Sequence, residues 1–138
     1  MTEDFEWTTK KLLKIDDNRG SIYVLEKPSL PFIVKRIFIT FHTEGERGGH
    51  AHILTKQLLI CLQGYLEVHA IGRNINFDLK LISPDTALYI PAKTWLELKN
   101  IRKNSIILVL ASEPYESSDY ISDFDKFMSI VSQGDDSS

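Results

Sequence analysis

The chain has 138 residues, which suffices for one compact domain with a core and is too short for two of ordinary size. It carries 16 basic and 19 acidic residues without a long block of like charge, so nothing favours a nucleic-acid partner. Its start lacks a signal-peptide pattern, and no apolar stretch approaches the ~20 residues of a membrane span. We therefore expect a cytoplasmic protein with no membrane partner.

Short apolar or alternating segments recur along the chain, separated by turn-forming residues. The segments are 21–25, 33–41, 57–62, 65–70, 75–80, 87–90, 95–98 and 105–111. The turn formers cluster at 17–20, 44–49, 63–64, 72–74 and 83–85. This regular spacing predicts an all-β barrel or sandwich.

Only the end of the chain has helical periodicity. Beyond Ser117, apolar residues follow at helical spacing: Tyr120, Ile121, Phe124, Phe127, Met128 and Val131. The pattern predicts one helix over about 117–131, packed on the outside of the barrel. Residues 132–138 contain no apolar residue to anchor them and are predicted to form a flexible tail after a single domain spanning 1–131.

Two histidines form the most distinctive feature of the sequence. His50 and His52 follow a glycine-rich turn and are two residues apart, so on a strand both imidazoles point to the same side. Two imidazoles in one cavity can exchange protons near neutral pH. We therefore predict that His50 and His52 are catalytic.

Arginines and aromatic residues supply candidates for substrate binding. Arg19, Arg36 and Arg47 suit a ligand that bears phosphates, because a guanidinium binds phosphate oxygens through two hydrogen bonds. Tyr89 and Trp95 are candidates for an apolar wall against a sugar or a base.

The histidines lie in a segment that resembles the first motif of the cupin superfamily, and 91–100 resembles the second. This implies a cupin fold, a double-stranded β-helix or jelly-roll barrel. A metal-binding cupin has a glutamate where this chain has Gln57 and a third histidine where it has Leu96. Two imidazoles without a carboxylate make a poor site for a divalent metal, so we expect neither a metal nor another cofactor.

The sequence more closely resembles the sugar 3,4-ketoisomerases that act on dTDP-4-keto-6-deoxyglucose. The similar segments are 19–21, 35–36, 47–52, Gln57, 88–90, 95–97, 109–112 and 119–121. The resemblance implies a metal-free homodimer with exchanged N-terminal strands, in the biosynthesis of dideoxy-aminosugars for surface polysaccharide. It also implies that Leu96 and Glu97 lie at the substrate.

The implied reaction moves a ketone from C4 to C3 through an enediolate. We expect His52 to take the proton from C3 and His50 to shuttle protons at the oxygens, although the reverse assignment stays open. Gln57 is expected to donate a hydrogen bond to a sugar oxygen.

Several alternatives stay open at this stage. A related cupin could epimerise C3 and C5 of the same substrate, and a sugar-nucleotide-binding module could lack turnover. Ile53, Lys56 and Leu96 depart from the family pattern. A metal-dependent dioxygenase is disfavoured by Gln57 and Leu96. The configuration of the product at C4, the nucleotide base and assembly beyond a dimer are not specified by the sequence.

Overall fold

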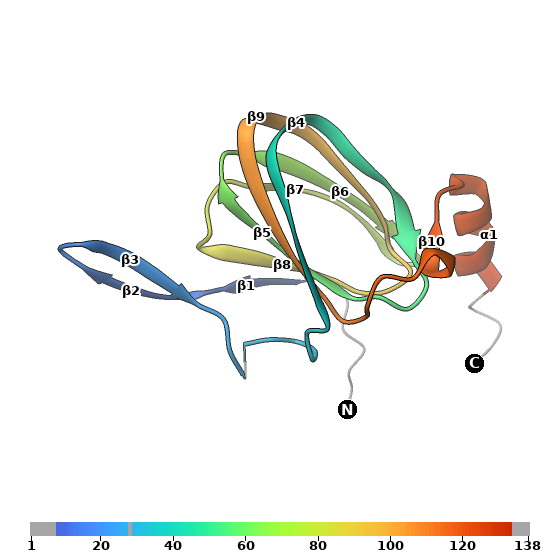
Figure 1. Cartoon of the computed structure of the whole chain (residues 1–138). Helices are drawn as coiled ribbons and strands as arrows, with labels where there is room; N and C mark the ends of the chain where they lie inside the picture. Colours follow the sequence, from blue (N-terminus) through green and yellow to red (C-terminus); the bar gives the residue numbers. More distant parts are fainter. Residues whose placement is uncertain (1–7, 28, 134–138) are drawn as a thin grey trace.

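The computed structural model describes residues 8–27 and 29–133, and most of its elements are β-strands (Figure 1). The first half contains β1 (Thr8–Lys11), β2 (Leu13–Asp17), β3 (Gly20–Val24), β4 (Arg36–His52) and β5 (Gln57–Gln63). The second half contains β6 (Leu66–Gly72), β7 (Ile75–Leu81), β8 (Thr86–Ile90), β9 (Trp95–Ala111), a 3₁₀ turn (Ser117–Asp119), β10 (Tyr120–Ile121) and α1 (Phe124–Gln133). The predicted all-β class with a single C-terminal helix is confirmed.

Eight strands form one antiparallel sheet that curls on itself (Figure 1). The main path of the sheet is β1-β8-β5-β9-β4-β10, and β6 and β7 join it through pairing of β6 with β9. The long strand β9 holds the sheet together, because it pairs with β4 along one edge and with β5 and β6 along the other. Within each strand, successive side chains point to opposite faces of the sheet.

The concave side of the sheet contains the main core, and separate clusters cover its convex side. Buried residues of the main core are Leu59, Cys61, Leu66, Val68, Ala70, Leu81, Leu88, Ile90, Leu96, Leu98, Ile101, Ile107 and Val109. A second cluster forms where the segment around Leu12 and Phe32 packs against Leu58 and Tyr89. In a third cluster, α1 packs on Trp95 through the fully buried Phe127. Parts of β5, β8 and β9 are consequently buried on both faces.

Strands β4 and β9 are both much longer than expected. The predicted turn at 44–49 is instead the middle of β4, which stays paired with β9 through several register shifts. Gly45, Gly48 and Gly49 adopt positive φ there, a conformation that glycine accepts at little cost. At Gly48 a β-carbon would also lie 2.7 Å from the carbonyl oxygen of Leu96. These bulges let one strand curve without ending.

The C-terminal helix begins later than the expected residue 117. Ser117–Asp119 form a 3₁₀ turn, and Tyr120–Ile121 pair with the end of β4. Asp119 hydrogen-bonds to the corner that follows β4, which pulls this segment into the sheet. The helix therefore starts at Phe124 and ends at Gln133. Of the tail expected over 132–138, residues 134–138 lie outside the described part of the chain.

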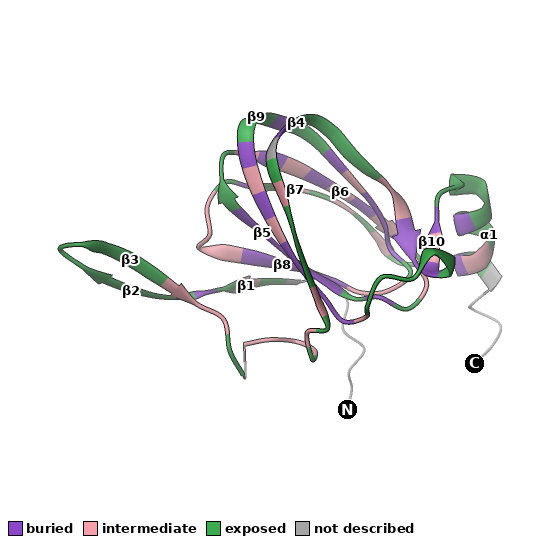
Figure 2. Ribbon diagram, viewed as in Figure 1, coloured by how far each residue is buried: buried purple, intermediate pink, exposed green. Residues whose placement is uncertain are grey.

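The hairpin of β2 and β3 extends away from the curled sheet and is exposed over most of its surface (Figure 2). Leu13, Ile15 and Ile22 share one of its faces, because Ile15 pairs with Ile22 and Leu13 with Val24. These three apolar side chains are 50–59% exposed. A two-stranded hairpin is at best marginally stable in water on its own. Separately, no helix in the described residues is long and apolar enough to cross a membrane.

Candidate active site

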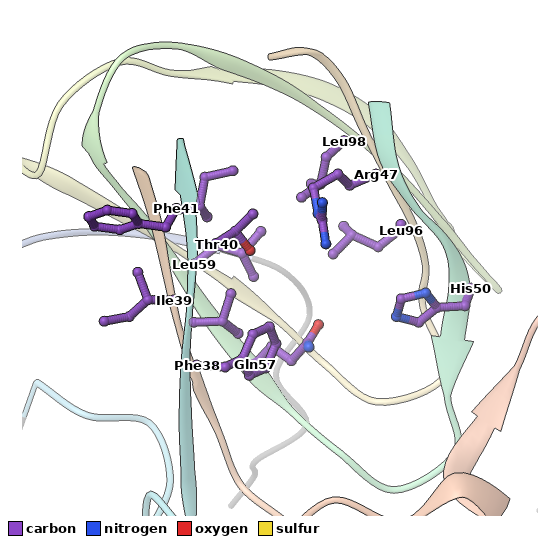
Figure 3. A pocket seen from close by; sticks show the side chains of 13 residues that line it. Phe38, Ile39, Thr40, Phe41, Arg47, His50, Gln57, Leu59, Leu96 and Leu98 are labelled. Carbon is purple, nitrogen blue, oxygen red and sulfur yellow. The ribbon is translucent and has the colours of Figure 1, made fainter. Parts of the chain in front are cut away.

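A cavity of about 420 Å³ opens on the concave side of the sheet (Figure 3). Arg47 and His50 point into it from β4, and Gln57 points into it from the start of β5. The rest of the lining is mostly apolar: Phe38, Ile39, Thr40, Phe41, Gly48, Leu59, Leu96, Leu98, Ile107 and Val109. A few polar groups in an apolar hollow are typical of small-molecule sites.

The two histidines lie on the same face of β4, as predicted, but their surroundings differ. Their rings are 5.2 Å apart between centroids and meet edge to face. His50 is half-buried and lines the cavity. His52 is only 4% exposed and is not part of the lining. Of the two histidines, His50 is therefore the one that is placed to contact a ligand in the cavity.

His52 is held by polar partners on both ring nitrogens. Its Nδ1 lies 3.0 Å from Oδ2 of Asp119, and its Nε2 lies 3.5 Å from Nε2 of Gln57. Asp119 also accepts hydrogen bonds from the Leu54 N–H at 2.6 Å and from the Thr55 hydroxyl. The buried carboxylate thus ties His52 to the corner between β4 and β5.

Tyr120 packs against both imidazoles. Its ring centroid is 4.3 Å from that of His52 and 5.1 Å from that of His50. Its hydroxyl accepts a hydrogen bond from Nη1 of Arg36 at 3.4 Å. The Arg36 guanidinium in turn lies over the rings of Phe38 and Tyr115. A positive charge is thereby fixed close to the histidine pair.

Both histidines have pKa values below the ordinary 6.5. Burial lowers the pKa of His50, and the neighbouring His52 lowers it further. Burial also lowers the pKa of His52 and outweighs the opposing effect of Asp119, while Arg36 adds to the lowering. Both imidazoles are therefore neutral at pH 7 and able to accept a proton.

Several of the residues predicted from the sequence meet at the cavity. His50, Arg47, Gln57 and Leu96 line it. Arg36 does not line it and instead supports Tyr120. The Arg36 Nε is buried and has no hydrogen-bond partner among the described residues.

Tyr89, predicted as a wall of the site, lies on the opposite face of the sheet. Its neighbour Leu88 faces the main core, so strand alternation turns Tyr89 outwards. There it is buried against Leu12 and Phe32, with its ring centroid 6.3 Å from that of Phe32. Tyr89 therefore does not line this cavity.

Trp95 and Glu97 also lie on the outer face, because Leu96 and Leu98 between and after them face inwards. Trp95 packs against Phe127 of α1, and its Nε1 donates a hydrogen bond to Glu97 at 3.0 Å. Their predicted contact with substrate in the cavity is not found. Trp95 instead packs the helix against the sheet, and Glu97 holds the indole N–H of Trp95.

Arg19 lies at the turn of the extended hairpin, away from the cavity of its own chain (Figure 1). Its side chain is 83% exposed and pairs with Asp17 at 2.6 Å. Within one chain, Arg19 therefore does not reach the site.

The residues at the cavity do not fit the metal of a cupin metalloenzyme. His50 at the cavity and the buried His52 beside it are accompanied by neutral Gln57, and the apolar Leu96 faces the cavity. Among the residues that the structure describes, no group of three or more His, Cys, Asp or Glu side chains is arranged to hold a metal ion. His52 also has its Nδ1 committed to Asp119.

Sequence reasoning did not place Asp119 or Tyr120 at the site. Both come from a segment more than 60 residues beyond the histidines, and β10 brings them together by pairing Tyr120 with His52. A signal was present, since 119–121 was one of the segments that resemble the ketoisomerases. The helical spacing of the apolar residues from Tyr120 onwards predicts a helix here instead.

The curled sheet and its inward-facing histidines define a cupin-type protein. The family model described as FdtA, WxcM-like C-terminal, matches residues 5–132, and the chain belongs to this family. It is 37% identical over 123 residues to TDP-4-oxo-6-deoxy-alpha-D-glucose-3,4-oxoisomerase of Aneurinibacillus thermoaerophilus, covering 87% of this chain and 88% of that protein.

Solved structures agree with this assignment. The WlaRB TDP-quinovose 3,4-ketoisomerase of Campylobacter jejuni is 35% identical with a TM-score of 0.85, covering 89% of this chain and 97% of that one. A variant of the 3,4-ketoisomerase QdtA of Thermoanaerobacterium thermosaccharolyticum, in complex with TDP-4-keto-6-deoxyglucose, is 28% identical with a TM-score of 0.88, covering 94% and 96% of the two chains.

Proposed function

We propose that this protein converts dTDP-4-keto-6-deoxyglucose into a dTDP-3-keto-6-deoxyhexose by proton transfer, as one step in making dideoxy-aminosugars for surface polysaccharide. The observation that carries the proposal is the half-buried, neutral imidazole of His50 in a cavity of about 420 Å³, in a chain whose relatives are named as 3,4-ketoisomerases. A base of this kind suits removal of a proton from the carbon next to a ketone.

His50 is the group that takes the C3 proton. The C3–H bond is weakened because the C4 carbonyl can hold the electron pair as an enediolate. The proton held by the His50 imidazolium exchanges with solvent, and His50 then delivers a proton to C4, which restores the neutral imidazole. The O3 hydroxyl passes its proton to O4, so that the ketone moves to C3 without any net change in atoms. Because His52 is buried and its two nitrogens are engaged, the geometry favours His50 over the His52 expected from the sequence.

The other cavity residues position the sugar nucleotide. Arg47 is exposed at the cavity and carries a charge that suits the diphosphate. Leu96 and Leu98 form an apolar wall against the deoxysugar. Arg36, which does not line the cavity, acts through Tyr120, whose ring holds both imidazoles in place.

The direct test is product analysis. We expect the purified protein, treated with a chelator, to move the ¹³C ketone signal of dTDP-4-keto-6-deoxyglucose from C4 to C3. A 3,5-epimerase would leave the ketone at C4 and invert neighbouring centres. A binding module would bind the sugar nucleotide and change neither signal, and either result would refute the proposal.

The lowered pKa of His50 gives a prediction for pH dependence. The reactive form is the neutral imidazole, so kcat/KM is expected to be level above neutral pH and to fall as His50 becomes protonated. Because burial lowers the pKa of His50 below 6.5, the inflection should lie below pH 6.5. A pH profile of kcat/KM checks this, and an inflection above pH 6.5 would contradict the assignment of His50.

We further propose that two chains form a homodimer by exchanging their N-terminal arms. The hairpin exposes Leu13, Ile15 and Ile22 on one face. Ile37 and Ile39 are exposed in the first part of β4, which pairs with β9 on one side and with no other strand of the described residues on its second side. Such surfaces are usually covered. A hairpin that reaches the partner would also bring Arg19 towards the partner's cavity.

Arm exchange predicts that charges on the apolar face of the hairpin weaken the dimer. The double variant Ile15→Asp, Ile22→Asp should elute as a monomer by size exclusion with light scattering, while the unaltered protein elutes as a dimer. Lys10→Asp, on the neighbouring strand β1 outside that face, is the matched control and should stay dimeric. A monomeric unaltered protein would refute arm exchange.

A further inference from the structure

Asp119 lies at one end of a chain of hydrogen bonds that ends in the cavity. The chain runs from its carboxylate to Nδ1 of His52, and from Nε2 of His52 to the amide of Gln57. Asp119, His52 and Gln57 are all less than 9% exposed, while Gln57 also lines the cavity. Polar atoms buried to this extent need complementary donors and acceptors.

The direction of these hydrogen bonds, from donor to acceptor, follows from the chemistry of Asp119. Asp119 already accepts hydrogen bonds from the Leu54 N–H and the Thr55 hydroxyl, and an ionised carboxylate has no proton to donate. The Nδ1 of His52 must therefore be the donor. A neutral imidazole has one N–H, so Nε2 of His52 is left as an acceptor and requires the N–H of Gln57.

We propose that Asp119 is a positioning residue that orients the Gln57 amide, so that Gln57 offers its carbonyl oxygen, an acceptor, to a hydroxyl of the bound sugar. The proposal rests on the proposed function and assigns Gln57 the role opposite to the donor expected from the sequence. An acceptor suits the C3 hydroxyl, which must release its proton as C3 becomes the ketone. The Gln57 carbonyl would therefore discriminate against sugar nucleotides that lack the C3 hydroxyl.

The variant Asp119→Asn reverses the direction of the hydrogen bonds from residue 119 to Gln57 and keeps a side chain of similar size at residue 119. Its oxygen must stay next to the Leu54 N–H, so its amide nitrogen takes the place of Oδ2 and donates to Nδ1 of His52. His52 then carries its proton on Nε2 and donates to Gln57. Gln57 consequently turns its NH₂ group towards the substrate.

Long-range ¹H–¹⁵N NMR of histidine-labelled protein reads the tautomer directly. The chain has four histidines, and the His52 signals are those that remain when His42, His50 and His69 are each replaced in turn by asparagine. At pH 8 we expect His52 to carry its proton on Nδ1 in the unaltered protein and on Nε2 in Asp119→Asn. Loss of the hydrogen bond to the sugar hydroxyl should lower kcat/KM by about 10- to 100-fold.

Thr55→Val is the matched control, because Thr55 contacts the same carboxylate oxygen but lies outside the chain to Gln57. It should keep the Nδ1 tautomer of His52. Charged and titratable neighbours of His52 are Arg36, His50 and Tyr120, and none of these is changed.

Three results would overturn the inference. They are an Nε2 proton on His52 in the unaltered protein, an unchanged tautomer in Asp119→Asn, and a switched tautomer with unaltered kcat/KM. The tautomer is measured without substrate, so it stays informative even if the protein does not isomerise the proposed sugar. Absence of turnover in the unaltered protein would refute the proposed function instead.

Discussion

Replacing His50 with asparagine is expected to lower kcat about 10²- to 10⁴-fold, the range that loss of a general base typically costs. The expectation follows from position, since His50 is the histidine that lines the cavity and it is neutral at pH 7. Asparagine has a similar polarity and size but cannot accept a proton near neutral pH. Initial rates with dTDP-4-keto-6-deoxyglucose provide the measurement.

Thermal unfolding controls for damage to the fold. The half-buried His50 contributes little to the core, so the melting temperature of His50→Asn should stay close to that of the unaltered protein. His52→Asn should behave differently, because it leaves the buried Asp119 without its imidazole partner and should destabilise the fold as well. Turnover within threefold of the unaltered rate in His50→Asn would remove His50 from the mechanism.

The largest expected effect on stability comes from Phe127→Ala in α1. Phe127 is fully buried, and its ring contacts Trp95 on the outer face of the sheet and Phe124 one turn earlier. Truncating a buried phenylalanine removes its contacts and leaves a cavity, which should lower the free energy of unfolding by about 3–5 kcal/mol. Urea unfolding followed by Trp fluorescence measures the change.

Met128→Ala is the matched control on the same helix. Met128 is 36% exposed, so its truncation should change the free energy of unfolding by no more than about 0.5 kcal/mol. An equal loss in both variants would show that helix propensity and not packing on Trp95 decides the stability. A loss below about 1 kcal/mol in Phe127→Ala would mean that α1 is not part of the cooperative core.

Most strands could be predicted from alternation and turn residues, because those signals are local. The prediction missed that β4 and β9 continue through apparent turns. At Gly45 and Gly48 the chain stays paired with β9, and pairing with a distant strand is not visible in the local sequence. The late start of α1 has the same cause, since Asp119 and Tyr120 are held by residues of β4 and the corner after it.

The candidate site was predictable where a motif placed residues on one strand face. His50 and Arg47 reach the cavity together with Gln57 and Leu96. Tyr89 and Trp95 were misplaced because both faces of their strands are covered, so alternation did not reveal which face lines the cavity. The roles of the two histidines depend on Asp119, a contact across 67 positions of sequence.

Proton exchange in deuterated water tests the central claim most directly. The unaltered protein, incubated with dTDP-4-keto-6-deoxyglucose in D₂O and followed by ¹H NMR, should yield the 3-keto sugar with deuterium at C4. The His50→Asn variant should show neither product nor exchange at C3 on the same timescale. Two results would contradict isomerisation by His50. One is loss of the C3 proton signal at an unaltered rate in His50→Asn. The other is exchange at both C3 and C5 in the unaltered protein while the ketone stays at C4.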